Sequence, residues 1–158
     1  MRHLTALIAA LAMLLAMASC SDGSCYDNGS SLPLVRFYAS GTTTQLSVQG
    51  LTIRGLDAPG DSVLVKNTAT SEVYLPLRAT TTSCQWEFTY MEEDEPSDTL
   101  TLAYRPIPYF ASAECGAMYN FEITSVTTTH HSIDSVQVVK PVIDNGSDVA
   151  LRVFFSIE

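Results

Sequence analysis

Histidines and clustered carboxylates are the side chains of this sequence that first suggest chemistry. His130 and His131 could bind a metal or titrate near neutral pH. Neighbouring residues of a strand point to opposite faces, however, so the two rings cannot easily chelate one ion together. The acidic residues 92–98 and 144–148 could attract calcium, but neither run has the ligand spacing of an EF-hand loop. We therefore expect polar turns at these places, no metal site and no cofactor.

Arg105 and the aromatic residues that follow it are the best candidate for a ligand surface. Two prolines between Arg105 and Phe110 favour an extended backbone. The rings of Tyr109 and Phe110 beside a guanidinium could hold a sugar or a peptide. The same segment could instead be a rigid connection that packs both rings onto the core. The sequence carries none of the common nucleophile, zinc-protease or nucleotide-binding motifs, so we predict no catalytic residues and no enzyme.

Three short motifs are typical of acceptors in bacterial periplasmic O-glycosylation. Each consists of Asp, a hydroxyl residue and an apolar residue. Because the pattern is short and matches by chance, it predicts modification at one or more of the sites and not at all of them. The hydroxyl residues are Ser62, Thr99 and Ser135.

The first nineteen residues are typical of a secretory signal. Arg2 and His3 precede an uncharged apolar run over residues 4–17, and small residues follow. A helix of this run would span about 21 Å, too short for a permanent transmembrane helix. Residues 17–20, Met-Ala-Ser-Cys, resemble the site at which lipoprotein signal peptidase cuts before a lipidated cysteine, although Met replaces the preferred Leu. A soluble secreted protein is the alternative; the motif favours removal of residues 1–19 and lipidation of Cys20.

Three acyl chains on Cys20 would anchor the mature chain permanently, since each buried methylene contributes about 0.8 kcal/mol. Residues 20–32 are rich in Ser, Gly, Asp and Asn, which indicates a flexible lipidated tether, and residues 33–158 would form the folded domain. We expect attachment to the cell envelope through the lipid anchor. The outer membrane fits best, on its periplasmic or its surface face.

Three cysteines remain beside the lipidated one, in a compartment where disulfides form. One disulfide and one free thiol is the simplest outcome. Cys84 alternates in phase with Trp86 and the aromatic residues after it, which favours a buried thiol in the core. This leaves Cys25 and Cys115 as the candidates for the disulfide, which would join the tether to the domain.

Alternating apolar residues and short polar turns dominate the sequence after residue 32. About eight or nine short strands at regular spacing predict an all-β fold, an antiparallel β-sandwich. A phase shift at Gly50 suggests a bulge, Pro76 favours an edge strand or a strand end, and residues 144–148 predict a hairpin turn. A parallel sheet is not expected, because no crossover helix is visible.

Composition limits the classes of partner. Apolar residues are 46% of the 158 residues and the formal net charge is −9, which indicates a globular chain and argues against binding nucleic acid.

Several sequence elements together resemble a known family. These are the lipidation motif with a nearby Cys, the Tyr104-Arg105 pair, the Ala-x-Cys-Gly element at residues 113–116 and the terminal Phe154-Phe155 pair. The chain is similar over nearly its whole length to a family of small bacterial lipoproteins, the domain of unknown function numbered 6452. The resemblance implies that Cys25 pairs with Cys115, and it brings no activity, cofactor or catalytic residue.

These observations favour a non-catalytic envelope lipoprotein that serves as a structural or interaction module. Its partners would be the membrane, through the lipid anchor, and an envelope protein. The alternative is a β-sandwich that binds a glycan or a peptide through Arg105, Tyr109 and Phe110.

Overall fold

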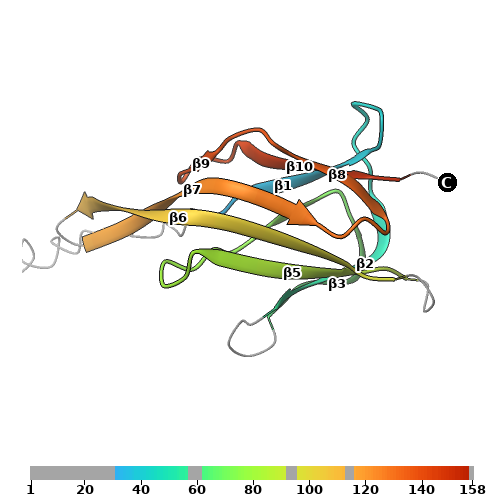
Figure 1. Ribbon diagram of the computed structural model, residues 1–158, viewed down its shortest axis with the longest axis horizontal. Coiled ribbons are helices and arrows are strands. Elements are labelled where there is room, and N and C mark those ends of the chain that lie inside the picture. Colours follow the sequence, from blue (N-terminus) through green and yellow to red (C-terminus); the bar gives the residue numbers. More distant parts are fainter. Residues whose placement is uncertain (1–30, 57–61, 92–95, 113–115, 157–158) are drawn as a thin grey trace, which may run out of the picture.

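The computed structural model describes residues 31–56, 62–91, 96–112 and 116–156. These residues form two β-sheets stacked as the layers of a sandwich, with no helix among them (Figure 1). The predicted all-β sandwich is therefore confirmed, with ten strands. In chain order they are β1 (Leu34–Ala39), β2 (Val48–Leu56), β3 (Val63–Thr70), β4 (Glu72–Tyr74), β5 (Ser83–Thr89), β6 (Asp98–Ser112), β7 (Gly116–Thr128), β8 (Ile133–Val138), β9 (Val142–Ile143) and β10 (Val149–Phe155).

The smaller sheet has the order β4-β1-β10-β8, and the larger sheet has the order β3-β2-β5-β6-β7-β9. Alternating apolar side chains from both sheets fill the space between them. Phe37 of β1 meets Phe88 of β5 edge to face, with ring centroids 6.2 Å apart, and Tyr90 meets Phe155 of β10 at 6.3 Å. Each buried aromatic ring contributes about 1.5–3 kcal/mol, so the period-two pattern fixes which face of each strand turns inward.

One strand pair departs from the antiparallel arrangement predicted from the sequence. β1 and β10 run parallel, from Leu34 beside Val149 to Ala39 beside Phe155. A parallel pair needs a long crossover connection. The eight strands between β1 and β10 supply that crossover, so the pair forms without a crossover helix.

The turn predicted at residues 144–148 is present, but it does not close a hairpin. β9 pairs with β7 in the larger sheet, whereas β10 belongs to the smaller sheet. Residues 144–148 therefore carry the chain from one layer to the other. Two strands that follow each other in sequence need not pair when each has a better partner elsewhere.

The predicted bulge at Gly50 is confirmed. The register of β2 against β3 shifts between Val48 and Leu51, and Gly50 has a φ of +60°. A Cβ atom there would lie 2.4 Å from the Cβ atom of Met91, so only glycine fits. Pro76 also lies where predicted, just beyond the edge strand β4.

Candidate functional site

β6 and β7 continue beyond the other strands of the larger sheet as a two-stranded projection. β5 pairs with β6 only as far as Ala103, whereas β6 and β7 stay paired out to Ser112 and Gly116. Figure 1 shows the pair extending past the sandwich at the left. We call residues 105–112 and 116–122 the projecting hairpin. The three residues predicted for the ligand surface all lie here, in a strand and not in a connection.

The two prolines of β6 occupy its open edge. The N–H of Tyr104 donates to the carbonyl oxygen of Thr82 at 2.9 Å, on the side that β5 covers. Because N–H groups alternate in direction along a strand, those of residues 106 and 108 would point to this same side after β5 has ended. Pro106 and Pro108 have no N–H, so the open edge offers fewer groups to another strand. The extended backbone expected for this segment is confirmed.

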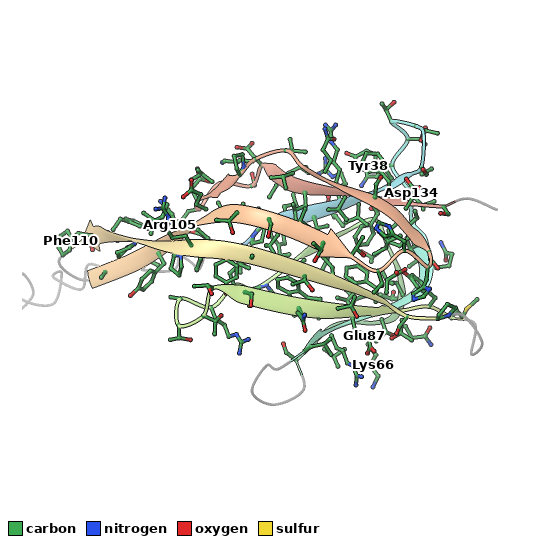
Figure 2. All side chains as sticks on the ribbon, viewed as in Figure 1. Tyr38, Lys66, Glu87, Arg105, Phe110 and Asp134 are labelled. Carbon is green, nitrogen blue, oxygen red and sulfur yellow. The ribbon has the colours of Figure 1, made fainter. Side chains whose placement is uncertain are left out.

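The predicted ligand residues are divided between the two faces of the hairpin. Arg105 and Tyr109 share the outer face, where Arg105 forms an ion pair with Glu122 across the strands. Phe110 points to the other face, which it shares with Tyr119, and it is 74% exposed at the end of the hairpin (Figure 2). The prediction that Arg105, Tyr109 and Phe110 form a single surface is therefore wrong, because neighbouring strand residues point in opposite directions. Phe110 does not pack on the core either.

A shallow hollow lies beside Tyr109. The side-chain amide of Asn145 donates to the Tyr109 hydroxyl at 3.2 Å. Lys140 bridges Asp144 at 2.8 Å and Asp148 at 3.1 Å, and its hydrogen bond lowers the pKa of Asp144 and raises its own pKa. The hollow has a volume of about 430 Å³, is open to solvent and is lined mostly by residues with polar side chains, so it suits a hydroxylated ligand better than an apolar one. Its lining also includes Asn120 and Gly146.

Ser31 ties the start of the described chain to the hairpin. Its hydroxyl donates to the carbonyl oxygen of Tyr119 at 2.9 Å and lies 3.2 and 3.0 Å from the amide oxygens of Asn120 and Asn145. Ser31 is 1% exposed. The sequence assigned this residue to the tether, and its polar composition gave no signal of burial.

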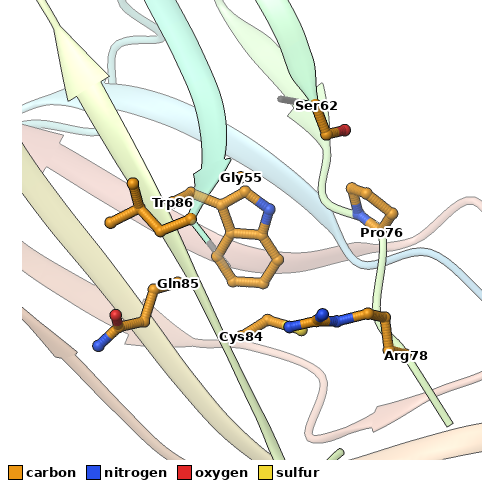
Figure 3. A pocket seen from close by; sticks show the side chains of 8 residues that line it. Gly55, Ser62, Pro76, Arg78, Cys84, Gln85 and Trp86 are labelled. Carbon is orange, nitrogen blue, oxygen red and sulfur yellow. The ribbon is translucent and has the colours of Figure 1, made fainter. Parts of the chain in front are cut away.

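A second hollow, of about 210 Å³, opens between β5 and the segment after β4 (Figure 3). Cys84 lies in its wall and is buried, as the alternation predicted. Its Sγ atom is 3.1 Å from the Tyr104 hydroxyl, which donates to the carbonyl oxygen of Arg78 at 2.9 Å. Burial raises the pKa of Tyr104, and the contact with Cys84 adds to it. These groups hold β5, β6 and the segment after β4 together. The lining comprises Gly55, Leu56, Ser62, Pro76, Arg78, Cys84, Gln85 and Trp86.

Asp98 is a buried carboxylate whose role the sequence did not reveal. It is 0% exposed and accepts hydrogen bonds from the hydroxyls of Tyr90 and Thr129 at 2.8 and 2.7 Å. The backbone N–H groups of residues 131, 132 and 133 donate to it at 3.0, 2.8 and 2.9 Å. Burial would raise the pKa of Asp98, but these donors outweigh it and hold the pKa below its usual value. Asp98 thus fixes the connection that carries the chain from β7 to β8.

The three motifs predicted for glycosylation lie in different surroundings. Ser62 lines the hollow at Cys84, and Thr99 is half-buried beside the fully buried Asp98. Ser135 is exposed, and its hydroxyl donates to Asp134 at 3.0 Å. Ser135 is therefore the most accessible of the three acceptors, and its modification stays a prediction.

The expected polar pair His130-His131 lies in the connection after β7, where an imidazole nitrogen of His130 is 2.9 Å from the Asp134 carbonyl oxygen. Across the described ranges, no three His, Cys, Asp or Glu residues gather as metal ligands. The same ranges hold no helix of the length and hydrophobicity that a bilayer crossing requires. The predicted lipidation and disulfide residues, Cys20, Cys25 and Cys115, and the acidic residues 92–95 lie outside the described residues.

Comparison with known proteins gives one result. The model of a family of unknown function, DUF6452, matches residues 46–155, which include β2 to β10 and both hollows. No curated protein and no solved structure matches the chain.

Proposed function

The chain belongs to the DUF6452 family of unknown function, and we propose from its lipidation motif and its fold that it is a lipid-anchored, non-catalytic module of the cell envelope. Removal of residues 1–19 would leave Cys20 to carry the lipid. The anchor fits the outer membrane, on its periplasmic or its surface face. The sandwich would then act as a structural or interaction subunit for an envelope protein.

The observation that carries this proposal is the junction at Ser31. The lipidation motif ends at Cys20, and eleven residues later the chain is buried against the projecting hairpin. A short polar tether thus joins the candidate lipid to a folded domain. The non-catalytic part of the proposal rests on how Asp98 and Cys84 are used. Each is buried, and each makes hydrogen bonds that connect strands and loops.

Metabolic labelling with a fatty acid tests the anchor. The wild-type chain should incorporate label and float with membranes, and Cys20→Ala should lose both. Cys25→Ala is the matched control, since it removes a neighbouring cysteine and should keep the label. Equal labelling of the Cys20→Ala chain would overturn the anchor.

A crosslinked pull-down tests the interaction role. A tag after residue 158 follows β10, which ends on the side of the molecule away from the projecting hairpin (Figure 1). The tag should therefore leave the hairpin free. One stoichiometric envelope complex would support the proposal, whereas recovery of bulk membrane protein alone would favour a small ligand.

A glycan or a peptide is the second candidate partner, and the polar hollow beside Tyr109 favours it. The ring of Tyr109 could stack on a sugar while the amides of Asn120 and Asn145 meet its hydroxyls. Tyr109→Ala should abolish binding on a glycan array. Phe110→Ala should retain it, because Phe110 points to the other face. Loss in both variants, or in neither, would argue against this hollow.

A further inference from the structure

The projecting hairpin carries an exposed apolar face at its end. Pro108 and Phe110 of β6 share this face with Ala117 and Tyr119 of β7, because residues paired across antiparallel strands point the same way. Phe110 is the most exposed large apolar side chain of the described residues, at 74%, and Tyr119 is 40% exposed. Farther in, Phe121 on the same face is 3% exposed, so the core-facing surface of the sheet runs on past the core.

The same segment is free of charge, in contrast to the rest of the chain. Residues 106–112 and 116–121 include no Asp, Glu, Lys, Arg or His, although the whole chain has a net charge of −9. Along the hairpin toward the sandwich, the first charged residues are Arg105 and Glu122, which form an ion pair with each other. Lys140 pairs with two aspartates beside Tyr109. Glu114 lies outside the described residues.

The tether enters the domain at this same end. Ser31 contacts the Tyr119 backbone, two strand positions from Phe110 in the register of β6 and β7. The eleven residues from Cys20 to Ser31 span at most about 40 Å. The opposite end of β6, at Asp98, lies twelve residues from Phe110, which is about 40 Å along a strand. An anchor at Cys20 would therefore always leave the hairpin end within about 40 Å of the bilayer and able to touch it, whereas the opposite end of β6 can lie up to about 40 Å farther away.

From these observations we infer that the end of the projecting hairpin lies against the lipid surface, with Phe110 and Tyr119 in the interfacial layer. Aromatic side chains are enriched at that layer, where an apolar ring and a polar hydroxyl each meet a suitable environment. The contact would hold the domain upright beside its anchor and direct the opposite end away from the membrane. This inference rests on the lipid anchor proposed above.

Tryptophan quenching tests it in the full lipidated chain. Trp86 is the only native tryptophan and is 2% exposed, so it gives a constant background. Phe110→Trp adds a reporter at the hairpin end. Met91→Trp adds a matched reporter at another exposed position, just after β5 and near Asp98, at the opposite end of β6. Each chain is bound to phosphatidylcholine vesicles with or without bromine on the acyl chains. Flotation of the vesicles is measured in parallel, and circular dichroism confirms folding.

We expect bromine to quench roughly half of the added emission in Phe110→Trp, because interfacial side chains lie about 5–10 Å into the boundary. Met91→Trp should lose none. A floating Phe110→Trp chain without quenching overturns the inference and leaves the anchor intact. Shielding of that indole with rising protein concentration, without quenching, would assign the face to a second copy of the chain. Equal quenching of both reporters also overturns it, and chains that fail to float overturn anchor and inference together.

Discussion

The two halves of β6 share one strand and one alternation, yet they lie in opposite environments. Between Asp98 and Tyr104 the strand has neighbours on both sides, and its inward side chains are buried. Between Arg105 and Ser112 it pairs with β7 alone, and Phe110, on the inward face, is largely exposed. A period-two pattern therefore determines the face that a side chain takes. Whether that face is covered depends on the other sheet, which ends before the hairpin does.

The largest effect is expected from Asp98, at the inner end of this strand. Asp98→Asn should lower the free energy of unfolding by about 3–5 kcal/mol. The carboxylate accepts hydrogen bonds from five donors, and the NH2 group of an asparagine would face some of those donors without accepting from them. Urea denaturation of the chain without residues 1–19 and with Cys20→Ser measures it. Asp134→Asn is the exposed control and should stay within about 0.5 kcal/mol of the parent. If Asp98→Asn lowers the free energy of unfolding by less than about 1 kcal/mol, the structural role of the Asp98 carboxylate is contradicted.

Truncation of one inward side chain in each half tests the comparison directly. Leu102→Ala should cost about 2–5 kcal/mol, since Leu102 is 0% exposed and its loss leaves a cavity. Phe110→Ala should change stability by no more than about 0.5 kcal/mol in the absence of lipid, because its ring is mostly in water. Similar losses in both variants, measured by urea unfolding, would show that the hairpin is packed in solution.

Acid should remove the stabilisation that Asp98 contributes at the inner end of β6. The pKa of Asp98 in the folded chain lies below the value of about 3.9 for an unfolded Asp, so protons bind the unfolded chain more readily. This contribution to stability is complete well above pH 4 and is lost as the pH falls through the folded pKa. The difference in unfolding free energy between the parent and Asp98→Asn should therefore shrink at low pH. The pKa of Asp144 is also lowered, so the variant should retain part of the acid sensitivity of the parent.

The smallest effect is expected on the outer face of the hairpin. Arg105→Gln should cost less than about 1 kcal/mol, because the ion pair with Glu122 is exposed to solvent and screened by salt. Thermal unfolding at low and high salt measures it, and the difference between the two chains should narrow in high salt. A larger, salt-independent loss would mean that the outer half of β6 is held by more than its pairing with β7.

Local features of the fold could be predicted from the sequence because period-two patterns and turn residues report local geometry. The buried Cys84 and the bulge at Gly50 are examples. The inward position of Asp98 also has a signal in the sequence. Asp98 alternates in phase with Leu100 and Leu102 on the core face, although it also ends an acidic run and begins a glycosylation motif.

Long-range partners could not be predicted from one sequence. Nothing in the residues of β1 and β10 specifies that the two strands pair, because alternation determines a face and not a neighbour. The burial of Ser31 also depends on backbone and amide groups from β7 and from the connection after β9, far away in the chain. The period of two also divides Arg105, Tyr109 and Phe110 between two faces, so alternation by itself argues against a single ligand surface.

The parallel pairing of β1 with β10 also has a mechanical consequence. The described chain enters the sandwich at the start of β1 and leaves it at the end of β10. A pull applied between the residues before β1 and those after β10 would slide these two strands past each other. All hydrogen bonds of the pair would then bear the load at once instead of opening one after another. The domain would therefore resist tension along this direction strongly. A force that peels the three-residue edge strand β4 away from β1 would meet far less resistance.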